Sequence, residues 1–187
     1  LGLKSTDEFR ALKGYDQSYL SQQEAIEFIE EWHQHIKAYA KEKSIGAEPE
    51  QIDLIKVIAA IRSLKVRAEA TNENKIEDLS EQQSTFAQVS ISASDEGGQI
   101  PAYIDFTCTP YAGLEIPMEN AADFTEERTF RMRFSTLTGG EKPRIKLSII
   151  RMDRHTKVMS DAFRYQIKRE LVEDDGTHNV YIGSWNR

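Results

Sequence analysis

The sequence predicts an α+β protein with two N-terminal helices and a C-terminal helix packed on an antiparallel sheet of four to six strands. Apolar residues recur at helical spacing between positions 25 and 61, alternate with polar residues in several segments between 66 and 149, and return to helical spacing between 158 and 167. Alternation makes each strand apolar on one face, and the helices are the elements available to cover that face.

The first predicted helix begins at a capping box, in which the side chains of Ser21 and Glu24 satisfy two free backbone donors. Residues 1–20 are polar, with a short turn at Lys13-Gly14, so we expect a lead-in that connects to a missing N-terminal part. Residues 21–187 then form a single α+β domain. The apolar positions after the capping box recur at offsets of three and four and predict one amphipathic helix ending near Ser44; they are Ala25, Phe28, Ile29, Trp32, Ile36, Tyr39 and Ala40.

A second helix is predicted from Pro49, because proline suits the first helical position, where its missing N–H is no loss. Between Ile52 and Ile61 this segment is apolar on most sides. Such a helix is buried between other elements, either between the first helix and the sheet or between two subunits.

The strands are predicted from alternation and from the turn residues that separate them. Gly97-Gly98 and Gly139-Gly140 lie between predicted strands and are interpreted as turn glycines. The predicted strands are 66–70, 87–93, 100–109, 128–135 and 144–149, with a short terminal strand at 180–182. Their inward residues include Ala102, Ile104, Phe106, Cys108, Phe130, Met132, Phe134, Ile145, Leu147 and Ile149, and the last helix is marked by Val158, Met159, Ala162, Phe163 and Ile167.

Positive charge is concentrated in one stretch of an acidic chain. Residues 128–169 hold 12 Lys/Arg and 3 Asp/Glu, a net charge of +9, while the whole chain carries −7 and the remainder therefore −16. Charge separated in this way is typical of complementary binding surfaces.

The alternation also predicts where these cations point. If the apolar residues face the core, Arg131 and Arg133 on one strand and Arg144 and Lys146 on the next share the outward face. We expect Arg151, Arg154 and Lys157 at its end, and Tyr103 beside it as a stacking surface. Three interpretations stay open: a solvated face whose cations pair with acids such as Asp105, a contact with the acidic surface of another subunit, or a surface that binds nucleic acid.

No catalytic, cofactor-binding or metal-binding pattern is present in the sequence, so we expect a protein that is not an enzyme. His33 and His35 are two residues apart on a predicted helix and point in different directions. The lone Cys108 occupies a core-facing position and indicates a buried thiol. The carboxylates of Glu119, Asp123, Glu126 and Glu127 lie in a long loop and are interpreted as a solvated acidic loop, because they lack the glycine-centred spacing of a calcium site.

The sequence gives two indications of compartment. A single cysteine excludes an intrachain disulfide and fits a reducing cytoplasm. No apolar run is long enough to span a bilayer, and no signal peptide is visible.

The order of several motifs resembles the YfdQ-like family of uncharacterised proteins of bacteriophages and prophages. The matching segments are LSQQEAIEFIEEW, IDLIKVIAAIRSLKVRAEA, IPAYIDFTCTPYAG, RTFRMRFSTL and KLSIIRMDRHTKVMSDAF, which together fall between about residues 9 and 170. In the last of these, the family pattern corresponds to Arg151, Arg154, His155, Asp161, Ala162 and Phe163. The resemblance implies a viral origin and a cytoplasmic location in the bacterial host, and it implies no established activity.

Two functional hypotheses follow. The preferred one is a non-enzymatic phage protein that assembles into a homo-oligomer or binds a host protein, with mimicry of DNA toward a host nuclease as a variant. The alternative is a nucleic-acid-binding accessory in phage replication or recombination. For either partner the candidate residues are Arg131, Arg133, Arg144, Lys146, Arg151 and Arg154.

Overall fold

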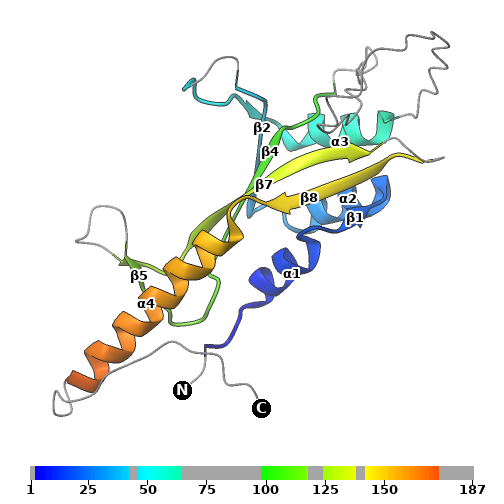
Figure 1. Ribbon diagram of the computed structural model, residues 1–187. Helices are drawn as coiled ribbons and strands as arrows, with labels where there is room; N and C mark the ends of the chain where they lie inside the picture. Colours follow the sequence, from blue (N-terminus) through cyan, green and yellow to red (C-terminus); the bar gives the residue numbers. More distant parts are fainter. Residues whose placement is uncertain (1–2, 43–45, 65–97, 118–123, 138–141, 173–187) are drawn as a thin grey trace, which may run out of the picture.

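The computed structural model describes residues 3–42, 46–64, 98–117, 124–137 and 142–172, and it confirms the predicted α+β class (Figure 1). A six-stranded antiparallel sheet has the strand order β1-β8-β7-β4-β2-β3, and β5 pairs with β6 in a separate two-stranded sheet. The elements are α1 (Asp7–Tyr15), β1 (Tyr19–Leu20), α2 (Gln22–Glu31), β2 (Ile36–Tyr39), β3 (Gln51–Ile52), α3 (Leu54–Ser63), β4 (Tyr103–Cys108), β5 (Ile116–Pro117), β6 (Phe124–Thr125), β7 (Arg128–Leu137), β8 (Arg144–Ile149) and α4 (Met152–Val172).

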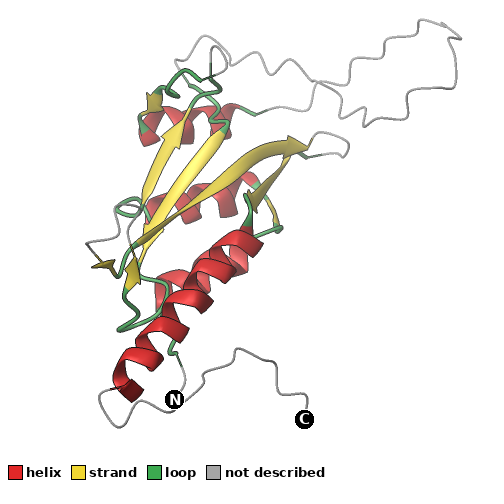
Figure 2. Cartoon of the chain, turned by 60° about the vertical axis from the view of Figure 1, so that its left-hand side comes forward, coloured by secondary structure: helices red, strands yellow, loops and turns green. Residues whose placement is uncertain are grey.

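Helices α1, α2 and α3 cover one face of the six-stranded sheet, which we call the inner face (Figure 2). Phe9 of α1 stacks on Phe130 of β7 at 5.2 Å between ring centroids, and Phe28 of α2 stacks on Phe106 of β4 at 6.1 Å. Helix α4 leaves the end of β8 and extends past the sheet toward β5 (Figure 1).

The predicted lead-in contains core residues. Thr6 caps helix α1 by accepting a hydrogen bond from the Phe9 backbone N–H, and Phe9 and Leu12 are completely buried. The turn expected at Lys13-Gly14 is wrong, since both residues belong to α1. Two apolar residues at a spacing of three were sufficient for a short helix because the sheet supplies the surface they bury.

The capping box at Ser21 and Glu24 is confirmed, but the long helix predicted after it is wrong. Helix α2 ends at Glu31, and Ile36–Tyr39 forms strand β2. In this strand Ile36 and Ala38 are buried and Lys37 is exposed, so the segment alternates as well as fitting a helical spacing. Ile36–Tyr39 pairs with the edge of β4, and this pairing selects the strand over the helix.

The second helix begins later than predicted. Asp53 is its N-cap and accepts a 2.9 Å hydrogen bond from the Ile55 N–H, so the start expected at Pro49 is wrong. The preceding Gln51–Ile52 pairs with β2 instead. Contacts of α3 with α2 and β2 confirm its place beside the first helix and the sheet. The expected burial on most sides is wrong, because α3 buries one side and Ile55 on another is 74% exposed.

The predicted inward residues of β4, β7 and β8 are confirmed, with Ile104, Phe106, Phe130, Met132 and Ile145 completely buried. Antiparallel pairing sets Asp105 opposite Arg131 and Arg133 opposite Ser148. The strands predicted at 66–70, 87–93 and 180–182, and the turn at Gly139-Gly140, lie outside the described residues.

Candidate functional site

The face of the sheet opposite the helices, which we call the outer face, has an unusual composition. The pairing register places five cations, three tyrosines and one carboxylate on it among the described residues: Lys37, Arg131, Arg133, Arg144 and Lys146, then Tyr19, Tyr39 and Tyr103, then Asp105. Each alternates with a buried inner-face residue in its strand. The outer face therefore carries net positive charge beside aromatic rings.

Arg131 lies on strand β7 of the outer face and forms an ion pair with Asp105 on β4. Its Nε and Nη2 atoms donate hydrogen bonds of 2.7 and 2.8 Å to the two carboxylate oxygens of Asp105. The same guanidinium lies over the ring of Tyr39 at 5.5 Å and over the ring of Tyr103 at 5.6 Å. The Asp105 hydrogen bond raises the pKa of Arg131, so the group stays charged, and its charge is neutralised locally.

Arg133 and Lys146 have no ion-pair partner in the part of the chain that the structure describes. Arg133 is exposed and lies opposite Tyr103, whereas Lys146 lies opposite Tyr19 with its Nζ 5.3 Å from the ring centroid. The two cations are diagonal neighbours on β7 and β8, because Arg133 pairs with Ser148 and Lys146 with Ser135. Diagonal side chains on adjacent strands are within reach of each other, so an anion between these two would relieve their repulsion.

An open hollow of about 550 Å³ lies over these same residues. Its lining includes Tyr19, Arg133, Ser135, Lys146 and Ser148. Two cations, two hydroxyls and an aromatic ring therefore converge on one concave region of an exposed sheet, which is suited to an anionic ligand with a planar group.

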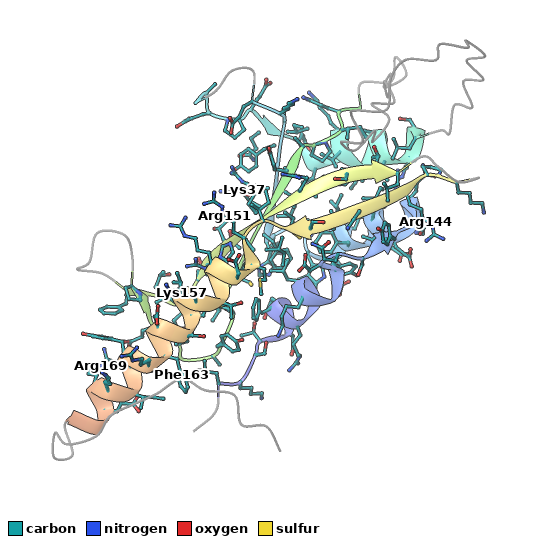
Figure 3. The ribbon with its side chains drawn as sticks, in the orientation of Figure 1. Lys37, Arg144, Arg151, Lys157, Phe163 and Arg169 are labelled. Atoms are coloured by element: carbon teal, nitrogen blue, oxygen red, sulfur yellow. The ribbon has the colours of Figure 1, made fainter. Side chains whose placement is uncertain are left out.

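The remaining predicted site residues do not join this hollow. Arg144 is exposed at the opposite end of β8 from Arg151, which lies in the turn directly before α4 and has a φ of 55° (Figure 3). Arg154 is exposed on α4. The pKa of Arg128 is lowered by the burial of its own guanidinium and, to a lesser extent, by the charge of Arg154. Arg144 instead adds to the lowering of the pKa of Glu24, whose main cause is hydrogen bonding with Ser21.

Tyr19 and Tyr39 were not recognised as site residues from the sequence. Tyr19 lies in the segment expected to be a lead-in, and Tyr39 lay within the predicted long helix. The signal available was the alternation of Ile36, Lys37, Ala38 and Tyr39, which puts a cation and a ring on neighbouring outward positions only if the segment is a strand.

Other reactive groups lie apart from the outer face. Cys108 is buried, and burial raises the pKa of its thiol to about 12, so it stays protonated and unreactive. His35 contacts the carbonyl oxygen of Thr107 through Nδ1 at 2.9 Å. Across the described ranges, no three His, Cys, Asp or Glu side chains are grouped so that they could hold a metal ion. Glu119 and Asp123 lie outside those ranges.

None of the helices in the described part of the chain has both the length and the apolar character needed to cross a bilayer.

Comparison with known proteins gives one match. The family model described as "Uncharacterized conserved protein (DUF2303)" matches residues 1–185. No curated protein and no solved structure matches the chain.

Proposed function

This chain belongs to the DUF2303 family of uncharacterized conserved proteins, and we propose that it is a non-catalytic, phage- or prophage-encoded protein that binds single-stranded nucleic acid with its outer face. The motif order that resembles the YfdQ-like phage proteins supports the viral origin. A cytoplasmic location in the bacterial host follows from that origin.

One observation carries the nucleic-acid proposal. The outer face combines five cations with three tyrosines, and its one carboxylate, Asp105, is already paired with Arg131. Cations bind the phosphates of a single strand, and aromatic rings stack on its bases without requiring a particular sequence. An exposed antiparallel sheet presents both kinds of side chain on one surface.

Much of the negative charge of helix α2 lies on the side away from the outer face. The exposed carboxylates of Glu24, Glu27, Glu30 and Glu31 lie on helix α2. The buried side of that helix packs on the inner face, so most of these carboxylates point away from the sheet. Glu27, Glu30 and Glu31 therefore face away from a nucleic-acid ligand on the outer face, whereas Glu24 interacts electrostatically with Arg144 at the end of β8.

Self-assembly is a second candidate function, and it would use the outer face and the acidic side of helix α2. The acidic side of α2 lies opposite the basic outer face. Among the described residues, only Glu30 of its four carboxylates forms an ion pair, with Arg62 at 3.6 Å. Opposite charges on opposite sides of one molecule favour a head-to-tail contact between copies, or a host protein with an acidic surface. Light scattering during size exclusion tests this, because such an assembly dissociates as salt is raised.

The nucleic-acid proposal is tested by fluorescence anisotropy with a labelled oligothymidylate between about 50 and 200 mM salt. Four outer-face cations, Lys37, Arg133, Arg144 and Lys146, have no ion pair within the described ranges. They give an expected slope of log affinity against log salt of about −3. The Arg133→Glu/Lys146→Glu variant is expected to lose binding. The Lys4→Glu/Lys56→Glu variant is the matched control, since it makes the same change in net charge at exposed positions outside the sheet.

Absence of any salt-dependent binding by the unmodified protein would contradict the proposal. Equal loss in both charge-reversal variants would also contradict it, because the effect would then come from net charge alone.

A further inference from the structure

Two tyrosine–cation pairs lie side by side across the outer face. Tyr103 of β4 is directly opposite Arg133 of β7, and Lys146 of β8 is directly opposite Tyr19 of β1. Because neighbouring strands are about 4.8 Å apart, the two tyrosines are separated by three strand spacings, roughly 14 Å across the sheet. They are also offset by two residues, roughly 7 Å, along the strands, since Arg133 pairs with Ser148 and Lys146 with Ser135. The order across the sheet is therefore ring, cation, cation, ring.

We propose that a single strand of nucleic acid crosses the outer face obliquely to the β-strands, with one base stacked on Tyr19, another on Tyr103, and the intervening phosphates on Arg133 and Lys146. This inference rests on the proposed function and adds the path of the ligand and its stacking residues. The two cations between the rings match the phosphates that lie between the two stacked bases of the ligand.

The hollow supplies the contacts that such a path requires. Arg133 and Lys146 are diagonal neighbours without ion-pair partners in the described ranges, so a phosphate between them removes a like-charge repulsion. The hydroxyls of Ser135 and Ser148 line the same hollow and can donate hydrogen bonds to phosphate oxygens. Tyr19 is 57% exposed, which leaves ring surface for a base beside the Lys146 ammonium.

The ring of Tyr19 belongs to a segment that is fixed in place. The backbone N–H of Gln17 donates a 2.8 Å hydrogen bond to the Leu147 carbonyl, and Asp16 Oδ1 accepts one of 2.8 Å from the Ile149 N–H. These bonds hold the chain before β1 against β8, so the backbone at Tyr19 pays little entropy when a ligand binds.

The second ring is also held in position, by a different contact. The guanidinium of Arg131 lies over the rings of Tyr39 and Tyr103 while it is anchored by Asp105. Arg131 is therefore a positioning residue for the stacking surface at that end of the path, whereas Arg133 and Lys146 contact phosphate. Bases paired inside a duplex cannot reach either ring, so the arrangement favours a single strand over a duplex.

The test measures the affinity of a labelled oligothymidylate for Tyr19→Ala and Tyr19→Phe variants of the full chain, with thermal unfolding of each variant recorded. Loss of the ring is expected to weaken binding roughly 5- to 150-fold, while Tyr19→Phe keeps the affinity because it keeps the ring. Tyr165→Ala is the matched control, since Tyr165 has a similar exposure of 54% but lies on α4. An oligoadenylate–oligothymidylate duplex is expected to bind more weakly than the single strand.

The outcomes separate this inference from the proposed function. If the unmodified protein binds and Arg133→Glu/Lys146→Glu abolishes binding, but Tyr19→Ala binds normally, the path over Tyr19 is wrong and the proposed function stands. Equal affinity for duplex and single strand would overturn base stacking on the tyrosines, and the proposed function would again stand. If the unmodified protein binds neither the single strand nor the duplex, this inference and the proposed function are both overturned. An oligomer that dissociates on charge reversal would then support the self-assembly candidate instead.

Discussion

The two hydrogen bonds from the Arg131 guanidinium to the Asp105 carboxylate, at 2.7 and 2.8 Å, join β7 to β4 at directly opposite positions. The Asp105 side chain is 13% exposed and that of Arg131 is 40% exposed, so the pair is only partly screened by water. Among the predicted outer-face cations, this one has a structural role, because its charge is already used within the chain.

Asp105→Ala is expected to lower the free energy of unfolding by about 1–2 kcal/mol, since it leaves the Arg131 guanidinium without its bidentate acceptor. Chemical denaturation measures this, and a double-mutant cycle with Arg131→Ala isolates the pair. A coupling energy near zero would show that the two charges are independent.

Gly98→Ala is expected to destabilise the protein by about 1–3 kcal/mol. A Cβ at this position would lie 2.7 Å from the backbone nitrogen and 2.8 Å from the Cα of Ala60 in helix α3, so the backbone must shift. This contact gives Gly98 a packing role beyond the turn role predicted from the sequence.

Gly14→Ala is the matched control for that substitution. Nothing lies within 4 Å of a Cβ at Gly14, which belongs to helix α1, so the change is expected to raise stability by up to about 1 kcal/mol. Thermal unfolding of both variants compares them directly, and similar shifts would contradict the contact with Ala60.

Gln22→Ala is expected to cost about 1 kcal/mol because the Gln22 amide closes the end of helix α3. Its Nε2 donates to the carbonyl oxygens of Ile61 at 2.6 Å and Leu64 at 3.1 Å at the helix C-terminus, where the Ile61 carbonyl also accepts the longer 3.3 Å bond from the Leu64 N–H. Gln23→Ala, at the exposed neighbouring position, is expected to leave stability unchanged in the same denaturation experiment. An equal loss from both variants would assign the effect to helix α2 alone.

Stability is expected to fall as the pH decreases through about 6.5, because the folded protein holds His155 in its neutral form. Burial, then the charges of Arg128 and Arg154, lower the pKa of His155 below its usual value of 6.5, and the Arg128 Nε donates a 2.7 Å hydrogen bond to its Nδ1. The unfolded chain therefore takes up a proton first as the pH falls, which favours unfolding. The neighbouring Asp153 opposes this shift only weakly.

Denaturation curves recorded from pH 8 to pH 5 measure that effect, with the range set by the usual histidine pKa. A His155→Gln variant is expected to lose less stability over the same range, because it has no proton to gain. The same pH dependence in both proteins would assign the effect to other groups.

The core-facing pattern of three strands could be predicted because it is a local property. Phe130, Met132 and Phe134 occupy alternate positions, and alternate side chains of a strand point to the same side whatever the partner strands are. The outward direction of Arg133 and Lys146 followed from the same rule. The capping box at Ser21 was equally readable, since its two partners are three residues apart.

The segment at Ile36–Tyr39 could not be assigned locally, because its apolar residues fit both a helix and a strand. Its pairing with β4, far along the chain, selected the strand. Similarly, Phe9 and Leu12 became core residues only because the sheet offered them a surface.

The sequence by itself determined which side chains point away from the core on β4, β7 and β8, because side-chain direction depends on the local backbone alone. Only the tertiary structure decided what lies beside them. The strand order brings Tyr19 next to Lys146, Tyr39 next to Tyr103, and Asp105 next to Arg131. Lateral neighbours in a sheet come from distant parts of the chain, so the composition of the outer face depends on the global fold.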